Sequence, residues 1–340
     1  MSRIVDPQTC ATYDLLGFVD PVNKQKITLE LGNSVLGKPI MIGNYQFLNG
    51  IPNFVDKDLL NEDELISLRW YEENFKDYDN YLPITFEILQ CEEKTERRKM
   101  YVAINILGGN RVLEIGAGTG IDSIELIKNL SPGDFYYIQD INYDVLQIAV
   151  EKMDREKNDV NVVPFLSSAN QLPFPDNYFD RIFHFGGVNN FGSNFSALTE
   201  MHRVLKVGGK ILLGDESIPP WLRETDYFKI LYDHNHYYGF MPPLKFIPKN
   251  STNFKLEWFM GSAFYFMVYE KTKNQPQGNF DIPIPGTRGG TLNSRYYGKL
   301  EGVDPMLKQQ FIEKVKALGL QQKNVLDKLL FEFINSQNQK

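Results

Sequence analysis

The stretch Val112–Gly120, with the sequence VLEIGAGTG, decides the fold. Its first half is short and apolar, as expected of a buried strand, and the amphipathic segment IDSIELIKNL follows at residues 121–130. Glycine at 116 and 118 allows a tight turn and lets a ligand approach the backbone closely. A helix that starts after such a turn offers unpaired N–H groups and a partial positive charge. The stretch therefore predicts a strand, a ligand-binding turn and a helix.

Outward from this stretch, strands and helices alternate. The predicted strands are residues 111–115, 135–141, 161–166, 181–185 and 210–216, and the predicted helices between them are 121–130, 143–157 and 195–206. A hairpin around Gly261 and Ser262 adds two strands within 253–270. Repeated β-α units with apolar strands are typical of a parallel sheet covered on both faces. We predict an α/β, Rossmann-like, seven-stranded and mostly parallel sheet with helices on both faces.

The flanking segments predict three parts. Residues 1–60 are expected to form a small β-rich N-terminal module. Residues 61–272 form the main domain, with lead-in helices at 61–107 and a core at 108–272. Asn61 and Glu64 match a capping box at the first lead-in helix, and a turn near Asp77–Asn80 is expected to split the region into two helices. Residues 273–340 form a C-terminal extension, a loop followed by two helices within 304–336.

The spacing of the glycines separates two cofactor classes. A dinucleotide fingerprint needs a third glycine at position 121, which is Ile121, so a dehydrogenase is disfavoured. Glu114 lies two residues before the first glycine. A carboxylate there would repel a pyrophosphate and attract an ammonium group.

Asp140 ends the second predicted strand, twenty residues after Gly120. An acidic side chain there can accept hydrogen bonds from both hydroxyls of a ribose. Capping of the following helix is the alternative, although Asn142 and Asp144 are also good caps. If Asp140 binds a ribose, Ile141 packs against the adenine.

Two further segments carry a family resemblance. The sequence SSANQLPFPDNYFDRIFHFGGVNNF at 167–191 and ALTEMHRVLKVGGKILLGDE at 197–216 follow the glycine turn in order. Together with it they resemble the class I methyltransferases that depend on S-adenosylmethionine, in particular the small-molecule methyltransferases related to the ubiquinone/menaquinone C-methylases. The resemblance covers about residues 111–216. It implies S-adenosylmethionine as the cofactor and S-adenosylhomocysteine as the product.

The same resemblance implies the cofactor-binding residues. Glu114 would lie near the methionine amino group. Tyr81 or Tyr78 would lie near the carboxylate, or these tyrosines would simply pack in the core. Ser168 stands where the family often has an aspartate that contacts the adenine, so this contact is expected to be weaker or rearranged. The residues expected to bind the cofactor are Glu114, Gly116, Ala117, Gly118, Gly120, Asp140, Ile141, Ser168, Ala169, Asn170 and Tyr81.

The N-terminal segment resembles the small zinc-ribbon-like module that accompanies several methyltransferases. Asp20-Pro21-Val22-Asn23 stands where that module has its cysteine pair, so the metal ligands are absent and no metal site is predicted. The module is expected either to cover the active site or bind substrate, or to be a structural cap.

Two residues are candidates for catalysis. His184 follows the fourth strand and could act as a general base, or it could be a hydrogen-bonded core histidine. Glu216 ends the fifth strand and could bind a cationic substrate or take a proton, or it could be a surface carboxylate. Ligands of open α/β sheets bind at the carboxyl ends of the strands, where both residues lie. Residues 184–190 read HFGGVNN and lack the Pro-Pro motif of many amino methyltransferases of nucleic acids and proteins.

Composition and charge limit the classes of substrate and the cellular compartment that we expect. The formal net charge is −7 and no long basic run occurs, which argues against a nucleic-acid substrate. Two cysteines, no signal peptide and no apolar run long enough to span a membrane predict a cytoplasmic protein. We predict methyl transfer to a small molecule. A peptide or protein substrate, a non-catalytic protein that binds S-adenosylmethionine and another enzyme of the same fold are the alternatives, and the oligomeric state is not predicted.

Overall fold

The computed structural model describes residues 3–4, 16–27, 29–30, 41–42, 44–106, 111–156, 159–192, 194–298 and 303–337. The strands are β1 (Arg3–Ile4), β2 (Leu29–Glu30), β3 (Met41–Ile42), β4 (Tyr45–Leu48), β5 (Ile51–Asn53), β6 (Arg111–Ile115), β7 (Phe135–Asp140), β8 (Asn161–Leu166), β9 (Phe179–Phe185), β10 (Leu205–Glu216), β11 (Ser251–Phe259) and β12 (Phe264–Lys271). The α-helices are α1 (Glu62–Ile88), α2 (Glu93–Ile104), α3 (Ile121–Ile127), α4 (Tyr143–Arg155), α5 (Asn194–Val204), α6 (Asp226–His234), α7 (Leu292–Tyr297), α8 (Pro305–Ala317) and α9 (Gln322–Gln337). Short 3-10 helices are η4 (Lys57–Leu59), η5 (Val188–Asn190), η6 (Pro220–Leu222), η7 (His236–Gly239) and η8 (Leu244–Phe246).

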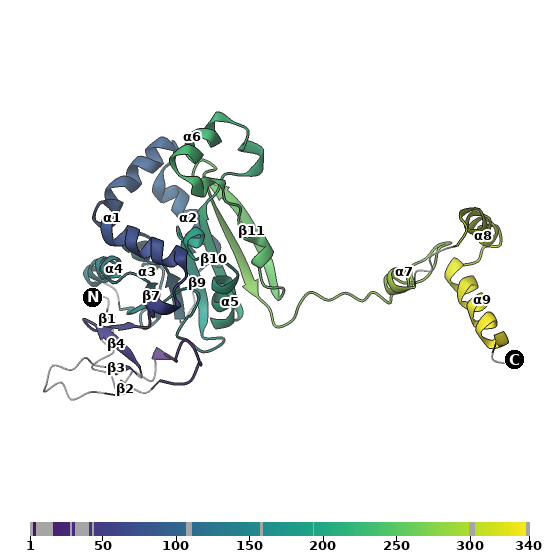
Figure 1. Ribbon diagram of the computed structural model, residues 1–340, viewed down its shortest axis with the longest axis horizontal. Helices are drawn as coiled ribbons and strands as arrows, with labels where there is room; N and C mark the ends of the chain where they lie inside the picture. Colours follow the sequence, from purple (N-terminus) through teal and green to yellow (C-terminus); the bar gives the residue numbers. More distant parts are fainter. Residues whose placement is uncertain are drawn as a thin grey trace. The chain divides into compact units, whose positions relative to one another are not determined.

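One sheet organises residues 1–275 (Figure 1). Its central strands run in the order β11-β12-β10-β9-β6-β7-β8. Strands β6 to β10 are parallel to one another, whereas β12 is antiparallel to β10 and β11. The predicted Rossmann-like class and the hairpin are therefore confirmed. This order brings the carboxyl ends of β6, β7 and β9 side by side, where a ligand site is expected.

The sheet is longer than the seven strands predicted. Among the described residues it has twelve, because β5, β4, β3 and β2 continue the order beyond β8 and β1 also pairs with β8. The contact is made by Asn53 of β5 opposite Leu166 of β8, and Phe54 N donates to Leu166 O at 2.8 Å. Strands from residues 1–60 thus cover an edge of β8 that would otherwise expose unpaired backbone groups.

Apolar side chains fill both faces of the sheet. One cluster joins buried residues of α5, such as Leu198 and Met201, to Phe18 and Phe54 of the N-terminal segment. The other joins α2, α3 and α4 through residues such as Met100, Leu126 and Leu146. Helices therefore cover both faces, as predicted.

Helix α1 corrects one prediction. It runs without a break from Glu62 to Ile88, through the turn expected at Asp77–Asn80 and past Pro83 inside the helix. The interruption falls later, at Leu89–Glu92, where Gln90 has a left-handed φ of 52°. A proline removes only one helical hydrogen bond, and burial of Phe86 and Leu89 near the end of α1 offsets that loss.

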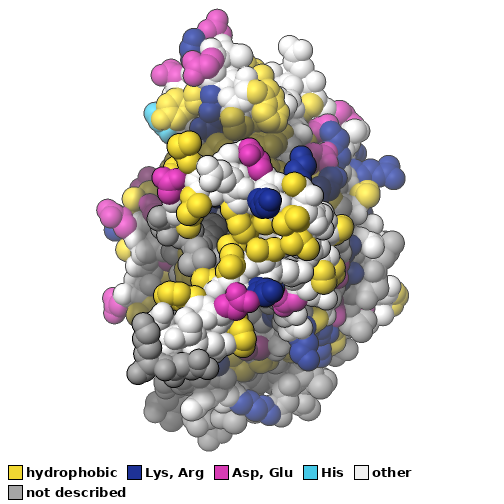
Figure 2. All heavy atoms as spheres, turned by 90° about the vertical axis from the view of Figure 1, so that its right-hand side faces the viewer, with side chains coloured by type: hydrophobic (Ala, Val, Ile, Leu, Met, Phe, Trp, Pro, Cys, Tyr) yellow, Lys and Arg dark blue, Asp and Glu magenta, His cyan; other side chains and the backbone are white. Residues whose placement is uncertain are grey.

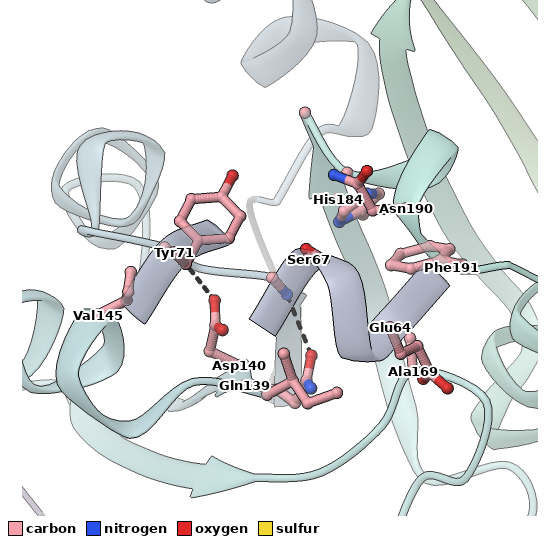
Figure 3. A pocket seen from close by; sticks show the side chains of 15 residues that line it. Glu64, Ser67, Tyr71, Gln139, Asp140, Val145, Ala169, His184, Asn190 and Phe191 are labelled. Carbon is pink, nitrogen blue, oxygen red and sulfur yellow. Dashed lines mark hydrogen bonds between the residues drawn. The ribbon is translucent and has the colours of Figure 1, made fainter. Parts of the chain in front are cut away.

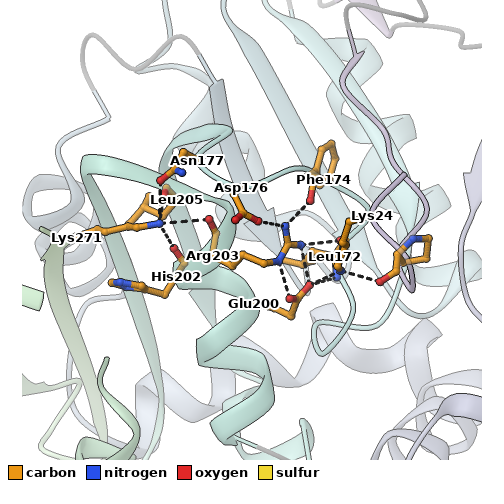
Figure 4. Close-up of polar contacts among 11 residues, drawn as sticks. Lys24, Leu172, Phe174, Asp176, Asn177, Glu200, His202, Arg203, Leu205 and Lys271 are labelled. Atoms are coloured by element: carbon orange, nitrogen blue, oxygen red, sulfur yellow. Dashed lines mark hydrogen bonds and ion pairs between the residues drawn. The ribbon is translucent and has the colours of Figure 1, made fainter. Parts of the chain in front are cut away.

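A network of charged side chains fastens the N-terminal segment to the core (Figure 4). Lys24 Nζ donates to Glu200 Oε2 at 3.0 Å, and Arg203 donates to both oxygens of Glu200, at 2.7 and 2.9 Å. Arg203 also reaches Asp176 at 3.0 Å. These contacts hold the start of the chain against α5, which carries Glu200 and Arg203.

Residues 276–340 form a second compact unit. The two predicted helices are confirmed as α8 and α9. The short helix α7 was not predicted, although Thr291 and Ser294 form a capping box at its start. No residue of α9 is buried.

The surface mixes charges of both signs. On the face drawn in Figure 2, Lys and Arg side chains are scattered among acidic and hydrophobic ones. Among the helices of the described residues, none has the length and apolar character needed to cross a bilayer.

Candidate active site

The glycine turn after β6 adopts the backbone conformation that glycine favours. Gly116, Gly118 and Gly120 have φ of 61°, 55° and 81°. A Cβ on Gly120 would lie 2.9 Å from Ala149 Cβ, so this glycine lets α3 and α4 approach each other. A Cβ on Gly118 would meet no atom within 4 Å, so this part of the turn faces open space. The turn therefore leaves room for a ligand over its backbone.

The end of β7 supports this turn. Asp140 Oδ2 accepts a hydrogen bond from Gly118 N at 2.9 Å, and Oδ1 accepts one from Asn142 N at 2.9 Å. Gln139 Oε1 accepts from Gly116 N at 3.0 Å. The cap of α4 is Asn142, whose Oδ1 accepts from Val145 N at 3.1 Å. Asp140 is thus not the helix cap, and its carboxylate retains capacity to accept a hydrogen bond from a ligand.

A small pocket of about 80 Å³ lies between the turn and α1. In Figure 3, Asp140 lies on the side of Tyr71 and Val145, whereas His184 lies beside Asn190 and Phe191. Seven of the predicted cofactor-binding residues gather at this pocket: Gly116, Gly118, Asp140, Ile141 and Ala169 line it, and Ser168 and Asn170 adjoin Ala169 in the chain. The predicted catalytic residue His184 lines it too. Sequence reasoning missed Glu64, Ser67 and Tyr71, which α1 contributes to the wall.

Glu64 closes the pocket beside Ser168. The Ser168 hydroxyl and Asn170 Nδ2, the latter at 3.0 Å, both donate to Glu64 Oε1. Glu64 Oε2 accepts from Asn61 N at 3.0 Å as part of the predicted capping box. The structure therefore places a carboxylate from α1 against the serine that stands where the family often has an aspartate. The capping box was the only sequence signal at Glu64, and it pointed to a local role.

Glu114 is enclosed at the end of β6. It is 2% exposed, and its carboxyl group accepts hydrogen bonds from Ser123 Oγ at 2.5 Å and from the Tyr136 hydroxyl. Burial raises the pKa of Glu114 to about 8, although both hydrogen bonds oppose the shift. The residue lines a second, larger cavity, where a cationic group would meet it.

His184 lies at the end of β9, opposite Ile115 of β6. Its Nδ1 lies 2.6 Å from Ile115 O, its side chain is buried, and burial lowers its pKa to about 4. Such a histidine is neutral near pH 7. Of the two roles predicted for His184, these contacts favour the hydrogen-bonded histidine over the general base.

The larger cavity has a volume of about 560 Å³ and opens beside the glycine turn. Aromatic side chains from several elements form much of its wall: Trp70, Tyr71, Tyr81, Phe86, Phe185, Tyr237, Tyr238 and Phe264. The predicted residues Glu114, Ala117 and Glu216 line it as well. Tyr81 is 66% exposed at this cavity, and the side chain of Tyr78 lies outside the described residues. The volume and lining suit a small aromatic or apolar molecule.

Glu216, Asn190 and Tyr237 line one part of this cavity, and Asp215 lies behind them. Asp215 is buried beside Glu216, and its carboxylate accepts from Asn189 N at 2.7 Å and Glu216 N at 2.9 Å. Burial, together with the charge of Glu216, raises the pKa of Asp215 well above its usual range. The Tyr237 hydroxyl donates to Asn190 Oδ1 at 2.5 Å. Burial raises the pKa of Tyr237, and the nearby carboxyl groups of Glu216 and Asp215 raise it further. Glu216 is therefore a partly buried carboxylate facing the cavity.

An ion pair forms another part of the wall. Arg97 Nη1 donates to both oxygens of Asp122, at 2.7 and 2.9 Å, and the guanidinium lies 5.7 Å from the ring centres of Phe86 and Phe185. Among the described residues, no group of three or more His, Cys, Asp or Glu side chains is placed to hold a metal ion.

Comparison with known proteins identifies relatives of this arrangement. The sequence model of the ubiE/COQ5 methyltransferase family matches residues 71–267, more than half of the chain. A ubiquinone/menaquinone biosynthesis C-methyltransferase from Cupriavidus metallidurans is 37% identical over 110 residues, which are 32% of this chain and 44% of that protein. A demethylmenaquinone methyltransferase from Geobacillus sp. is 30% identical over 178 residues, 51% of this chain and 70% of that protein. The match thus spans less than half the length of the first of these relatives.

Among solved structures, phosphoethanolamine N-methyltransferase 2 of Haemonchus contortus in complex with S-adenosyl-L-methionine is 15% identical, with a TM-score of 0.47. That alignment covers 61% of this chain and 60% of that chain.

Proposed function

The chain belongs to the ubiE/COQ5 methyltransferase family, and we propose that it transfers the methyl group of S-adenosylmethionine to a small molecule. The acceptor would bind in the aromatic-lined cavity. One observation carries the proposal: the glycine turn, Asp140 and the larger cavity meet at the carboxyl ends of β6, β7 and β9. A cofactor seated over the turn would face an acceptor in the cavity.

The residues at the turn fit the cofactor. The Asp140 carboxylate lines the small pocket and could accept hydrogen bonds from ribose hydroxyls, and Gly118 leaves space above the turn. Ile141 and Ala169 would contact the adenine, and the Glu114 carboxyl group would meet the amino group of the methionine part. Bound S-adenosylmethionine would supply a methyl group attached to positively charged sulfur. An electron-rich atom of the acceptor takes the methyl group, and the sulfur is the leaving group.

The protein would position the acceptor and take up its proton. A carbon or oxygen nucleophile loses a proton when it gains a methyl group. Of the carboxyl groups that line the cavity, Glu114 has a raised pKa and Asp122 is paired with Arg97, which leaves Glu216 to accept the proton. Aromatic side chains would orient a flat acceptor by stacking. One relative is named for ubiquinone and menaquinone biosynthesis, and the other is named a demethylmenaquinone methyltransferase. A reduced quinone-type compound is therefore the first acceptor to test.

The test has two stages. Calorimetric titration of the full chain with S-adenosylmethionine and S-adenosylhomocysteine should show saturable binding that Asp140→Ala weakens at least tenfold. Asp144→Ala is the matched control, because Asp144 is exposed in the first turn of α4 and lines neither cavity. Failure of the wild-type chain to bind either ligand would overturn the proposal.

The second stage measures transfer of labelled methyl groups to a short-chain reduced demethylmenaquinone. Glu216→Gln should slow transfer about a hundredfold or more while binding of S-adenosylhomocysteine stays within twofold. Glu224→Gln, an exposed residue beyond β10, should leave both unchanged. Binding without transfer to quinols, other small molecules or peptides would instead favour a non-catalytic protein.

Three finer expectations belong with this proposal. Residues 1–60 derive from a metal-free zinc-ribbon-like module that either covers the active site or binds substrate, or acts as a structural cap; the described residues of this segment line neither cavity. A peptide acceptor is the second candidate class for the methyl transfer. The protein works in the cytoplasm.

A further inference from the structure

His184 has one ring nitrogen with a partner and one without. Nδ1 lies 2.6 Å from Ile115 O, whereas Nε2 is buried and has no hydrogen-bond partner among the described residues. The whole residue is 1% exposed. A buried polar atom without a partner is costly, and such atoms are rare in folded proteins.

The partner of Nδ1 determines what Nε2 can do. A backbone carbonyl only accepts hydrogen bonds, so Nδ1 carries the proton and donates to Ile115 O. In the neutral ring Nε2 is then an acceptor. Burial lowers the pKa of His184 to about 4, which keeps the ring in this form near neutral pH.

The neighbours of the ring keep it in place. A Cβ on Gly116 or Gly187 would lie 3.2 or 3.0 Å from His184 Cε1, so both positions leave space that the imidazole uses. The Phe191 ring lies 4.6 Å away, centre to centre, on another side. The ring is therefore held with Nε2 in a fixed position.

The small pocket is the space that this ring borders. His184 lines it together with Gly116, Gly118 and Asp140, and Figure 3 shows His184 on the side away from Asp140. A group that reaches Nε2 in this pocket must donate a hydrogen bond. A carboxylate or carbonyl oxygen would be repelled there.

We propose that His184 Nε2 accepts a hydrogen bond from an N–H or O–H group of the bound nucleoside cofactor. His184 is then a binding residue that selects for a donor, and this assignment rests on the proposed function. S-adenosylhomocysteine offers three such donors: the α-ammonium group, the ribose hydroxyls and the adenine amino group.

Calorimetry with matched analogues tests the assignment. The probes are S-adenosylhomocysteine and three analogues, which lack the α-amino group, lack the ribose hydroxyls, or carry two methyl groups on the adenine amino nitrogen. His184→Phe should weaken binding of S-adenosylhomocysteine about tenfold, the effect of one buried hydrogen bond. For one analogue, the wild type and His184→Phe should bind with equal affinity, and the group missing from that analogue is the donor. His202→Phe is the control, since His202 is buried but lines neither cavity.

A second measurement leaves the chain unaltered. In the wild-type protein labelled with ¹⁵N on histidine, saturation with S-adenosylhomocysteine should move the Nε2 resonance of His184 upfield, while Nδ1 stays protonated. This shift reports a new hydrogen bond to the acceptor nitrogen, and it remains available if His184→Phe folds poorly.

The outcomes separate this assignment from the proposed function. If the wild-type chain binds S-adenosylhomocysteine but Nε2 does not shift, or His184→Phe binds it equally well, the assignment to His184 is wrong and the proposed function stands. The assignment is also wrong if each analogue binds more weakly than S-adenosylhomocysteine by the same factor in the wild type and in His184→Phe. If the wild-type chain binds neither cofactor form, both proposals are wrong.

Discussion

At the scale of single residues, the carboxyl group of Glu114 lies between Ser123 and Tyr136, away from water. Its pKa of about 8 in the folded chain lies well above the value near 4.3 of an exposed glutamate. The folded state therefore binds a proton that the unfolded state releases between about pH 4.5 and pH 8. Stability is full below this window and falls as pH rises through it.

Glu114→Gln should remove this dependence. Because the amide does not ionise, the free energy of unfolding of the wild type should fall relative to the variant by up to about 1.4 kcal/mol per pH unit inside the window. Urea unfolding of both proteins from pH 5 to pH 8 measures the difference. Parallel stability curves would show that Glu114 titrates at its ordinary pKa.

Cofactor binding should also change the fraction of Glu114 side chains that carry a proton. A cofactor ammonium group beside this carboxyl group would lower its pKa, so binding near pH 7 should release up to about one proton. Calorimetry in buffers of different ionisation enthalpy measures the release. Glu114→Gln should abolish it, and an unchanged release in that variant would assign the proton to another group.

At the scale of elements, the start of α1 connects three segments. Asn61 Oδ1 accepts from Glu64 N at 3.0 Å, and Asn61 Nδ2 donates to Phe191 O at 3.1 Å in the loop after β9. Glu64 in turn binds Ser168 and Asn170 after β8. The start of α1 thereby holds one wall of the small pocket in position.

Asn61→Ala should destabilise the chain by about 1–2 kcal/mol, the usual cost of losing a helix cap. It should also weaken binding of S-adenosylhomocysteine, because Glu64, Ser67 and Tyr71 line the pocket from this helix. Asn61→Ser keeps the cap but not the bond to Phe191 O, so it should lose less stability. Urea unfolding and calorimetry measure the two effects, and equal losses in both variants would contradict the role of the cap.

A buried lysine performs a similar task at the end of α5 (Figure 4). Lys271 Nζ donates to His202 O and Leu205 O, both at 2.7 Å, and to Asn177 Oδ1 at 3.0 Å. Lys271→Met should cost about 1–3 kcal/mol because the carbonyl oxygens lose their donor while buried. Chemical unfolding tests this against Lys273→Met, an exposed neighbour that should change little. Similar losses in both variants would contradict the capping role.

At the scale of the whole molecule, the chain divides after Gln275 into two compact units. Every residue that lines the small pocket or the larger cavity belongs to the first unit. The exposed apolar side chains of α9, such as Leu329 and Phe333, belong to the second.

A chain that ends at Gln275 should therefore bind S-adenosylhomocysteine within about twofold of the full chain and fold cooperatively. Calorimetry and thermal unfolding of the purified fragment measure both properties. A fragment that folds but binds at least tenfold more weakly would show that residues 276–340 contribute to the site.

Local sequence patterns were enough to predict the strand–turn–helix unit at Val112–Gly120, the order of β-α units, the hairpin at 253–270 and the family. These features depend on local patterns: glycine at sharp turns, apolar runs in strands and the period of amphipathic helices. The sequence also predicted the neighbours of the pocket at Asp140, Ile141 and Ala169, because strand ends in a parallel sheet meet at one edge.

Features that depend on distant contacts and on burial became visible only in the folded chain. Ser168 meets Glu64 across 104 residues of chain, and no local pattern reports that contact. Helix α1 continues past Pro83 because packing outweighs a local turn signal. The protonation of Glu114 and His184 follows from how completely the folded chain removes each side chain from water, which the order of residues alone does not state.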